Sequence, residues 1–146
     1  MPHPDPKPLD GVFAPVVTPF RSDLSPDPAR YVAHCRWLVS QGAGLAAFGT
    51  NSEANSLGLA ERKALLEALV DGGVPPQRMM PGTGCNAIVE TVELTRHAVA
   101  LGAAGVLMLP PFYYKGVTDD GLFDAYARIV EAVRADPLRG ILYHRP

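Results

Sequence analysis

The feature that most constrains this chain is a regular alternation of short apolar segments with longer amphipathic ones. The apolar segments predict buried β-strands at residues 11–17, 45–48, 78–81, 106–109 and 141–144. Helical spacing of apolar residues predicts a helix from Pro28 to Gly42 or Gly44, and helices at 59–70, 88–101 and 121–134. Each strand and its helix take about 30 residues, the size of one βα crossover unit. This order is typical of a parallel sheet covered by helices.

Two α/β architectures fit the alternation: a doubly wound open sheet and part of a (βα)8 TIM barrel. Periodicity alone does not choose between them. A complete barrel typically takes about 250 residues, so this chain has room for about five of its eight units. The proline-rich residues 1–8 predict a flexible tail, and residues 9–146 are expected to form one partial barrel domain.

Composition restricts the class of function. A net charge of -2 without a basic stripe argues against a nucleic-acid partner. No apolar run reaches the roughly 18 residues of a membrane-spanning helix, so no membrane partner is predicted. The two cysteines, Cys35 and Cys85, form no disulfide framework and favour a reduced, cytoplasmic location. No pair of residues has zinc-ligand spacing, so neither a metal nor another cofactor is predicted.

The loops after the strands hold the candidate functional residues, because parallel α/β folds place their chemistry at the carboxyl ends of strands. The segment Phe-Gly-Thr-Asn-Ser-Glu, residues 48–53, gathers two hydroxyls, an amide and backbone N–H groups. Such donors can hold a small carboxylate without a buried cation. The same residues also fit an ordinary turn whose polar side chains cap the loop.

A second loop, Gly-Thr-Gly-Cys-Asn-Ala at residues 82–87, matches the GxGxxA pattern of dinucleotide-binding folds. That pattern also expects an acidic residue about 20 positions later, at the end of the next strand. The sequence there reads Gly-Val-Leu-Met-Leu-Pro-Pro and offers none. Nucleotide binding stays open as an alternative that rests on this pattern alone.

Tyrosines mark the ends of two successive predicted strands. Tyr113 and Tyr114 follow the strand at 106–109, and Tyr143 lies in the strand at 141–144. Phenols at adjacent strand ends could relay a proton, with Thr50 as the link. Tyrosines in such positions can equally be packed with their hydroxyls in water.

Taken together, five loop motifs carry a family resemblance. In chain order they read Ala-Pro-Val-Val-Thr-Pro-Phe, Gly-Thr-Asn-Ser-Glu, Pro-Gly-Thr-Gly-Cys-Asn, Leu-Pro-Pro-Phe-Tyr-Tyr and Leu-Tyr-His-Arg-Pro. From about Leu9 to the last residue, the chain resembles the N-terminal half of the dihydrodipicolinate synthase / N-acetylneuraminate lyase family of Schiff-base aldolases. The resemblance implies a (βα)8 barrel, of which this chain covers about the first five strands.

The resemblance also implies roles for individual residues. A lysine of the family forms an imine with pyruvate or a related 2-oxo acid, and the derived enamine reacts with an aldehyde or imine partner. Tyr143 matches the proton-shuttling tyrosine, and Thr50 matches the hydroxyl that joins the relay. Thr50 and Asn51 match the carboxylate-binding loop. Tyr113 matches a tyrosine that reaches into a neighbouring subunit, which implies a homo-oligomer; Tyr114 is the less favoured register.

Some positions depart from the family pattern. Asn51 stands where threonine or serine is usual, so it can donate to a carboxylate but cannot relay a proton as a hydroxyl does. Ser52 replaces a glycine, His144 an asparagine and Arg145 an aliphatic residue. These differences favour a divergent subgroup with a different aldehyde partner.

The Schiff-base lysine of the family would follow Tyr143 on the next strand, beyond residue 146. The chain has lysines at 7, 63 and 115, and none of the three matches it. We therefore expect an interrupted barrel that is inactive alone, although its family is that of lyases. The alternative is a non-catalytic half-barrel that binds a 2-oxo acid or a partner chain.

Overall fold

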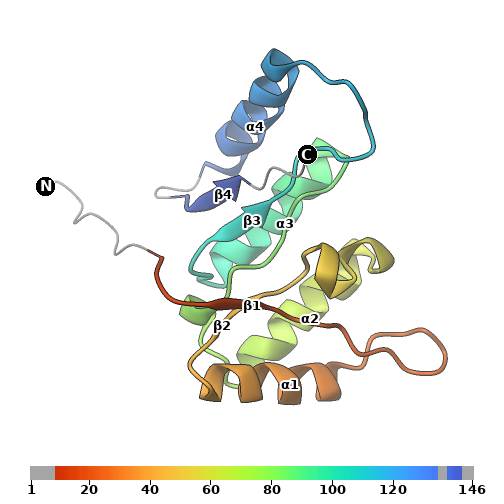
Figure 1. The fold of residues 1–146 in the computed structure, drawn as a ribbon, viewed down its shortest axis with the longest axis vertical. Helices are drawn as coiled ribbons and strands as arrows, with labels where there is room; N and C mark the ends of the chain where they lie inside the picture. The colour runs from red at the N-terminus through yellow and green to blue at the C-terminus, as the bar shows by residue number, and fades with distance from the viewer. Residues whose placement is uncertain (1–8, 135–137, 143–146) are drawn as a thin grey trace, which may run out of the picture.

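The structure is a computed structural model that describes residues 9–134 and 138–142. Strands and helices alternate along it except between α2 and α3, where no regular strand forms (Figure 1). The strands are β1 (Phe13–Pro15), β2 (Gly44–Ala46), β3 (Val106–Met108) and β4 (Gly140–Leu142). The α-helices are α1 (Pro28–Ser40), α2 (Leu59–Asp71), α3 (Ile88–Ala100) and α4 (Asp119–Val133). Short 3-10 turns are η1 (Thr50–Ser52), η2 (Ala54–Ser56) and η3 (Pro76–Arg78). Within the described ranges, no helix combines the length and the apolar character needed to cross a membrane.

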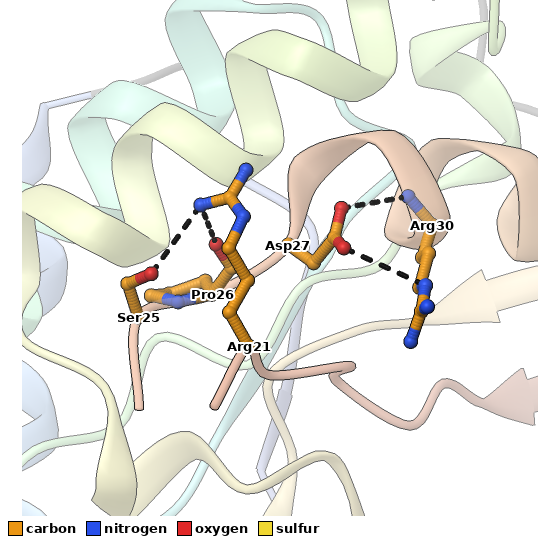
Figure 2. Close-up of polar contacts among 5 residues, drawn as sticks. All are labelled: Arg21, Ser25, Pro26, Asp27 and Arg30. Atoms are coloured by element: carbon orange, nitrogen blue, oxygen red, sulfur yellow. Dashed lines mark hydrogen bonds and ion pairs between the residues drawn. The ribbon is translucent and has the colours of Figure 1, made fainter. Parts of the chain in front are cut away.

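Helix α1 begins where the sequence predicts. Asp27 is its N-cap: the carboxylate accepts a hydrogen bond from the Arg30 N–H at 3.1 Å and lies 3.6 Å from the Arg30 Nε (Figure 2). Pro28 takes the first helical position, where a missing N–H costs no helical hydrogen bond. Arg21 closes the preceding loop by donating to the Pro26 carbonyl at 2.9 Å. The predicted start at Pro28 is therefore confirmed.

The strands lie parallel and side by side in the order of the sequence, and this arrangement is called the wall below. β1 pairs with β2, and β3 pairs with β4, both in parallel. Residues 79–82 join the two pairs, because Met79 bridges Leu45 of β2 and Gly82 bridges Leu107 of β3. The order is thus β1, β2, residues 79–82, β3 and β4, without reversal. A doubly wound sheet reverses its strand order, so the structure decides in favour of the barrel type.

The third predicted strand, at 78–81, is less regular than the sequence suggests. It makes isolated bridges instead of a continuous strand. Its contact with β2 is well formed, since the Met80 N–H donates to the Leu45 carbonyl at 2.8 Å. Pro81 has no N–H to donate toward β3, which interrupts the ladder on that side. Of the last predicted strand, β4 confirms the part up to Leu142, and the rest lies outside the described residues.

The wall has two different faces, because successive side chains of a strand point to opposite sides. One face is covered by the helices and forms the core with Val16, Leu45, Ala47, Met79, Val106 and Met108. The helices contribute buried residues that the sequence predicts, namely Tyr31, Cys35, Leu65, Leu66 and Leu69. The opposite face lines a cavity with Phe13, Pro15, Ala46 and Leu107. In a closed barrel this second face is the interior.

The described wall has open edges, since β1 and β4 each pair with a single named strand. Exposed apolar residues lie on the β4 side, including Phe123 of α4 and Leu142 of β4, which are 73% and 58% exposed. Unpaired edges and exposed apolar surface favour association. We therefore expect the chain to self-associate or precipitate when it is expressed alone. Sedimentation velocity checks this, and a monodisperse monomer that unfolds cooperatively would contradict it.

Candidate active site

The loop after β2 holds the predicted carboxylate-binding residues on a constrained backbone. Phe48 and Glu53, at its two ends, have φ values of 56° and 54°. Positive φ is unfavourable for a bulky side chain such as phenylalanine, and backbone strain of this kind clusters at functional sites. Between these ends, Thr50 and Asn51 lie in the η1 turn and both are exposed. The backbone thus presents these two polar side chains at the end of β2.

Hydrogen bonds to the loop after β1 fix the back of this turn. The Glu53 carboxylate accepts from the Thr18 N–H at 2.7 Å, and the Thr18 hydroxyl donates to the Ser52 carbonyl at 2.8 Å. Thr18 and Ser52 are both buried. The Ser52 hydroxyl itself donates to the Ala46 carbonyl at 3.4 Å. The serine at position 52 is therefore accommodated, and it ties the turn to β2.

Two adjoining cavities open at this end of the wall. The inner cavity, of about 440 Å³, is lined by the uncovered strand face together with Thr50 and Asn51. The outer cavity, of about 480 Å³, is lined mainly by residues 109–112 and 114–117, after β3. Thr50 and Leu109 line both cavities. A carboxylate in the inner cavity could accept hydrogen bonds from the Thr50 hydroxyl and the Asn51 amide.

The loop after β3 presents Tyr113 and Tyr114 to solvent. Asn86 holds it in place, since its side-chain oxygen accepts from the Tyr113 N–H at 2.9 Å. Tyr113 is 75% exposed, packs edge-on against Tyr114 and lines neither cavity. Lys115 lines the outer cavity and donates to the Phe112 carbonyl of its own loop at 3.2 Å. Tyr113 and Thr50 are therefore not brought together within one chain.

The glycines of the Gly-Thr-Gly-Cys-Asn-Ala loop have a packing role. A Cβ at Gly82 would lie 2.2 Å from the Phe48 carbonyl oxygen, and one at Gly84 would lie 2.5 Å from the Leu109 nitrogen. Only glycine permits strand ends to approach so closely. This close packing accounts for the GxG pattern without a nucleotide.

The two cysteines are buried thiols. Burial raises the pKa of Cys35 to about 12. Burial also raises the pKa of Cys85, and the Arg62 guanidinium, whose Nη1 lies 3.3 Å from the Cys85 Sγ, offsets part of that rise. A thiol with a raised pKa is a poor nucleophile at neutral pH. Both cysteines thus have the character of packed residues.

Among the predicted site residues, Thr50 and Asn51 meet at the inner cavity, whereas Tyr113 lies in the exposed loop. Tyr143 lies outside the described residues. Sequence reasoning missed Arg62, which is only 5% exposed. A signal existed, because Arg62 stands three and four positions before the buried Leu65 and Leu66, on the inner face of α2.

The strands lie parallel in chain order, with polar loops and cavities at their carboxyl ends. This arrangement defines part of a (βα)8 barrel, a fold whose enzymes carry their active sites at that end. The chain belongs to the Dihydrodipicolinate synthetase family, whose family model matches residues 8–146. The family and the fold class expected from the loop motifs are thereby confirmed.

Named relatives and solved structures give the same result. The chain is 34% identical over 137 residues to a 4-hydroxy-tetrahydrodipicolinate synthase of Rhizobium meliloti, covering 93% of this chain and 45% of that protein. It superposes on dihydrodipicolinate synthase from Agrobacterium tumefaciens with a TM-score of 0.89 and 32% identity, covering 93% of this chain and 48% of that one. For YagE of Escherichia coli K12, solved in complex with pyruvate, the TM-score is 0.81, the identity 32% and the coverage 93% and 45%. The chain therefore spans about half the length of the relatives it matches.

Proposed function

We propose that this chain supplies the 2-oxo-acid-binding half of a lyase that acts on pyruvate or a related 2-oxo acid through a lysine Schiff base. The observation that carries the proposal is the pair Thr50 and Asn51, which line the inner cavity at the end of β2. Both offer donors suited to a carboxylate. The pyruvate complex of YagE, whose fold matches this chain, supports a 2-oxo acid as the ligand.

In the proposed reaction, the lysine amine condenses with the ketone of the 2-oxo acid and releases water. Loss of a proton from the adjacent carbon gives an enamine, which forms a carbon–carbon bond to an aldehyde or imine, and hydrolysis of the resulting imine frees the lysine and the product. In the reverse direction, cleavage of that bond releases the aldehyde and leaves the enamine on the lysine, where protonation and hydrolysis then release the 2-oxo acid. The lysine belongs to a strand after β4. Neither Lys63, which pairs with Glu93 at 2.9 Å, nor Lys115, which donates to its own loop, is assigned this role.

Proton transfer is assigned to three hydroxyls. Tyr143 acts as the acid and base at the reacting centre, and Thr50 connects it to a tyrosine. The exposed Tyr113 is that tyrosine, and it serves the site of a neighbouring subunit in a homo-oligomer. Asn51 has no hydroxyl, so its part is confined to binding the carboxylate.

Support for a lyase also comes from the relatives, which are called synthases or lyases. The names of these relatives do not support the alternative of a non-catalytic half-barrel. A cytoplasmic location stays a prediction from the cysteine content.

Replacing Thr50 with valine tests the carboxylate-binding role. The substitution removes one donor at nearly constant volume, so binding of pyruvate should weaken by about 1 kcal/mol, roughly a fivefold rise in Kd. Thr50→Ser keeps the hydroxyl and should bind as the wild type does. Line broadening of ¹³C-labelled pyruvate measures the affinity even in an associated sample. Equal affinity for Thr50→Val and the wild type would remove Thr50 from the site.

A further inference from the structure

Helix α2 carries a positive charge into the protein interior. Arg62 is only 5% exposed and lies beside Leu65 and Leu66 on the inner face of the helix. Burying a guanidinium is costly unless it is paired and hydrogen-bonded. No carboxylate pairs with it among the residues described, and its Nε atom is buried without a hydrogen-bond partner. Because burying this charge costs free energy, we expect Arg62 to have a role that offsets the cost.

The contacts of Arg62 all lie at the ends of neighbouring strands. Its Nη2 donates to the Gly82 carbonyl at 2.5 Å, and its Nη1 lies 3.3 Å from the Cys85 Sγ. The guanidinium carbon stands 6.0 Å from the centre of the Phe48 ring, within the range of a cation–π contact. The Phe48 ring also stacks on Tyr31, with a centroid distance of 6.0 Å. Phe48 is therefore held by contacts from both α1 and α2.

These contacts lead directly to the carboxylate-binding turn. Phe48 has a positive φ and immediately precedes Gly49, Thr50 and Asn51. Gly82, which Arg62 holds by its carbonyl, packs so closely on Phe48 that a Cβ there would lie 2.2 Å from the Phe48 oxygen. The buried Arg62 side chain thus fixes Phe48, which begins the turn, and also the Gly82 backbone against which Phe48 packs.

We propose that Arg62 is a positioning residue that sets the geometry of the Thr50–Asn51 donor pair through Phe48 and Gly82, without touching the 2-oxo acid. The forked guanidinium suits this task because it reaches two acceptors at once in a fixed plane. The link to 2-oxo acid binding rests on the proposed function, whereas the link to the geometry of the turn does not.

Amide hydrogen exchange of the full chain tests the positioning. The Ser52 and Ala54 N–H groups both donate to the Gly49 carbonyl, at 3.0 and 3.3 Å, so their exchange reports on the turn. In Arg62→Met these amides should exchange about 10-fold faster, and pyruvate should bind about 10-fold more weakly. The Met80 amide, bonded to β2, should keep its wild-type rate.

Two further variants separate geometry from charge and from general stability. Arg62→Lys keeps the positive charge but lacks the planar guanidinium with its several donors. It should therefore speed the exchange of Ser52 and Ala54 and weaken pyruvate binding, as Arg62→Met does. Wild-type exchange and affinity in Arg62→Lys would overturn the proposal, because the charge alone would then suffice. Arg96→Met is the matched control, since Arg96 also donates to a carbonyl, that of Ala132 at 2.5 Å, but on the exposed side of α3. Arg96→Met should change neither the exchange rates of Ser52 and Ala54 nor the affinity for pyruvate. Unchanged exchange of Ser52 and Ala54 in Arg62→Met would equally overturn the proposal.

Alkylation of Cys85, followed by peptide mass spectrometry, distinguishes local loosening from unfolding. The charged groups that act on this thiol are Arg62 from α2, which lowers its pKa, and Glu90 from α3, which raises it. Loss of Arg62 in a folded chain should move the pH midpoint of alkylation upward. General unfolding would instead bring it down to about 8.5, the value of a free thiol; that outcome would make Arg62 a stability residue and overturn the proposal. If the wild type binds no pyruvate, the proposed function fails while the exchange and alkylation tests still decide the role of Arg62.

Discussion

Borohydride reduction of this chain in the presence of pyruvate is expected to leave every lysine without a pyruvyl adduct. An imine forms only where a deprotonated amine is held at the carbonyl carbon of the bound 2-oxo acid. Lys63 lines neither cavity and pairs with Glu93 on the outer side of α2. Lys115 reaches the outer cavity, but it is exposed and bonded to the Phe112 carbonyl. Lys7 lies outside the described residues, and no adduct is expected there.

Peptide mass spectrometry after reduction gives the readout. Reduction without pyruvate supplies the background, and a complete dihydrodipicolinate synthase treated in parallel supplies the positive control. A stoichiometric adduct confined to Lys115 would contradict the expectation and would mean that the outer cavity has its own imine-forming lysine.

The same borohydride experiment should give a different result for any longer protein of which these residues are a part. There the adduct should appear on a lysine about 30 residues beyond Tyr143, one βα unit further on. Tyr143→Phe in that protein should lower kcat by about 10²- to 10⁴-fold, the usual contribution of a positioned acid or base. Turnover unaffected by Tyr143→Phe would remove this tyrosine from the proposed relay.

Gly82→Ala, which adds a single methyl group, should be strongly destabilising. Its Cβ would lie 2.2 Å from the Phe48 oxygen and 3.3 Å from the Gly49 nitrogen. Both atoms belong to the backbone and cannot rotate away, so two strand ends must separate. We expect a loss of about 3 kcal/mol in the free energy of unfolding, at the upper end of overpacking costs.

Urea denaturation of the two proteins measures this loss. Gly49→Ala is the matched control on the other side of the same contact, because nothing lies within 4 Å of its added Cβ. Its stability should stay within about 0.5 kcal/mol of the wild type. Equal stability of Gly82→Ala and Gly49→Ala would show that the strand ends are not packed as closely as the structure has them.

Local signals made much of the fold predictable. Asp27 and Pro28 specify the start of α1 through nearest-neighbour chemistry, and that start is observed. The strand at 78–81 was harder, because Pro81 interrupts its ladder and its pairing depends on partners more than 20 residues away in each direction. Pattern alone also could not choose between an open sheet and a barrel, since strand order is a property of the assembled wall.

The candidate site was predictable in part. The donors of Thr50 and Asn51 are visible in the sequence as a polar cluster after an apolar strand. What holds them is not visible there: the bond from the Thr18 N–H to Glu53 spans 35 positions, and that from Arg62 to Gly82 spans 20. Such contacts arise only when successive βα units pack, so no single segment encodes them.

The two cavities differ in how they are built, and this difference bears on how the protein can diverge. The inner cavity is lined by β1, β2, residues 79–82 and β3 together with Gly49, Thr50, Asn51 and Leu109, so its shape depends on the strands and on the turn after β2. The outer cavity is made chiefly by one continuous stretch after β3, ending at Val117. Substitutions or insertions in that stretch can remodel the outer space while the strands stay in register. Changes at residues 110–117 can therefore alter what the outer cavity accepts without replacing any residue that lines the inner one.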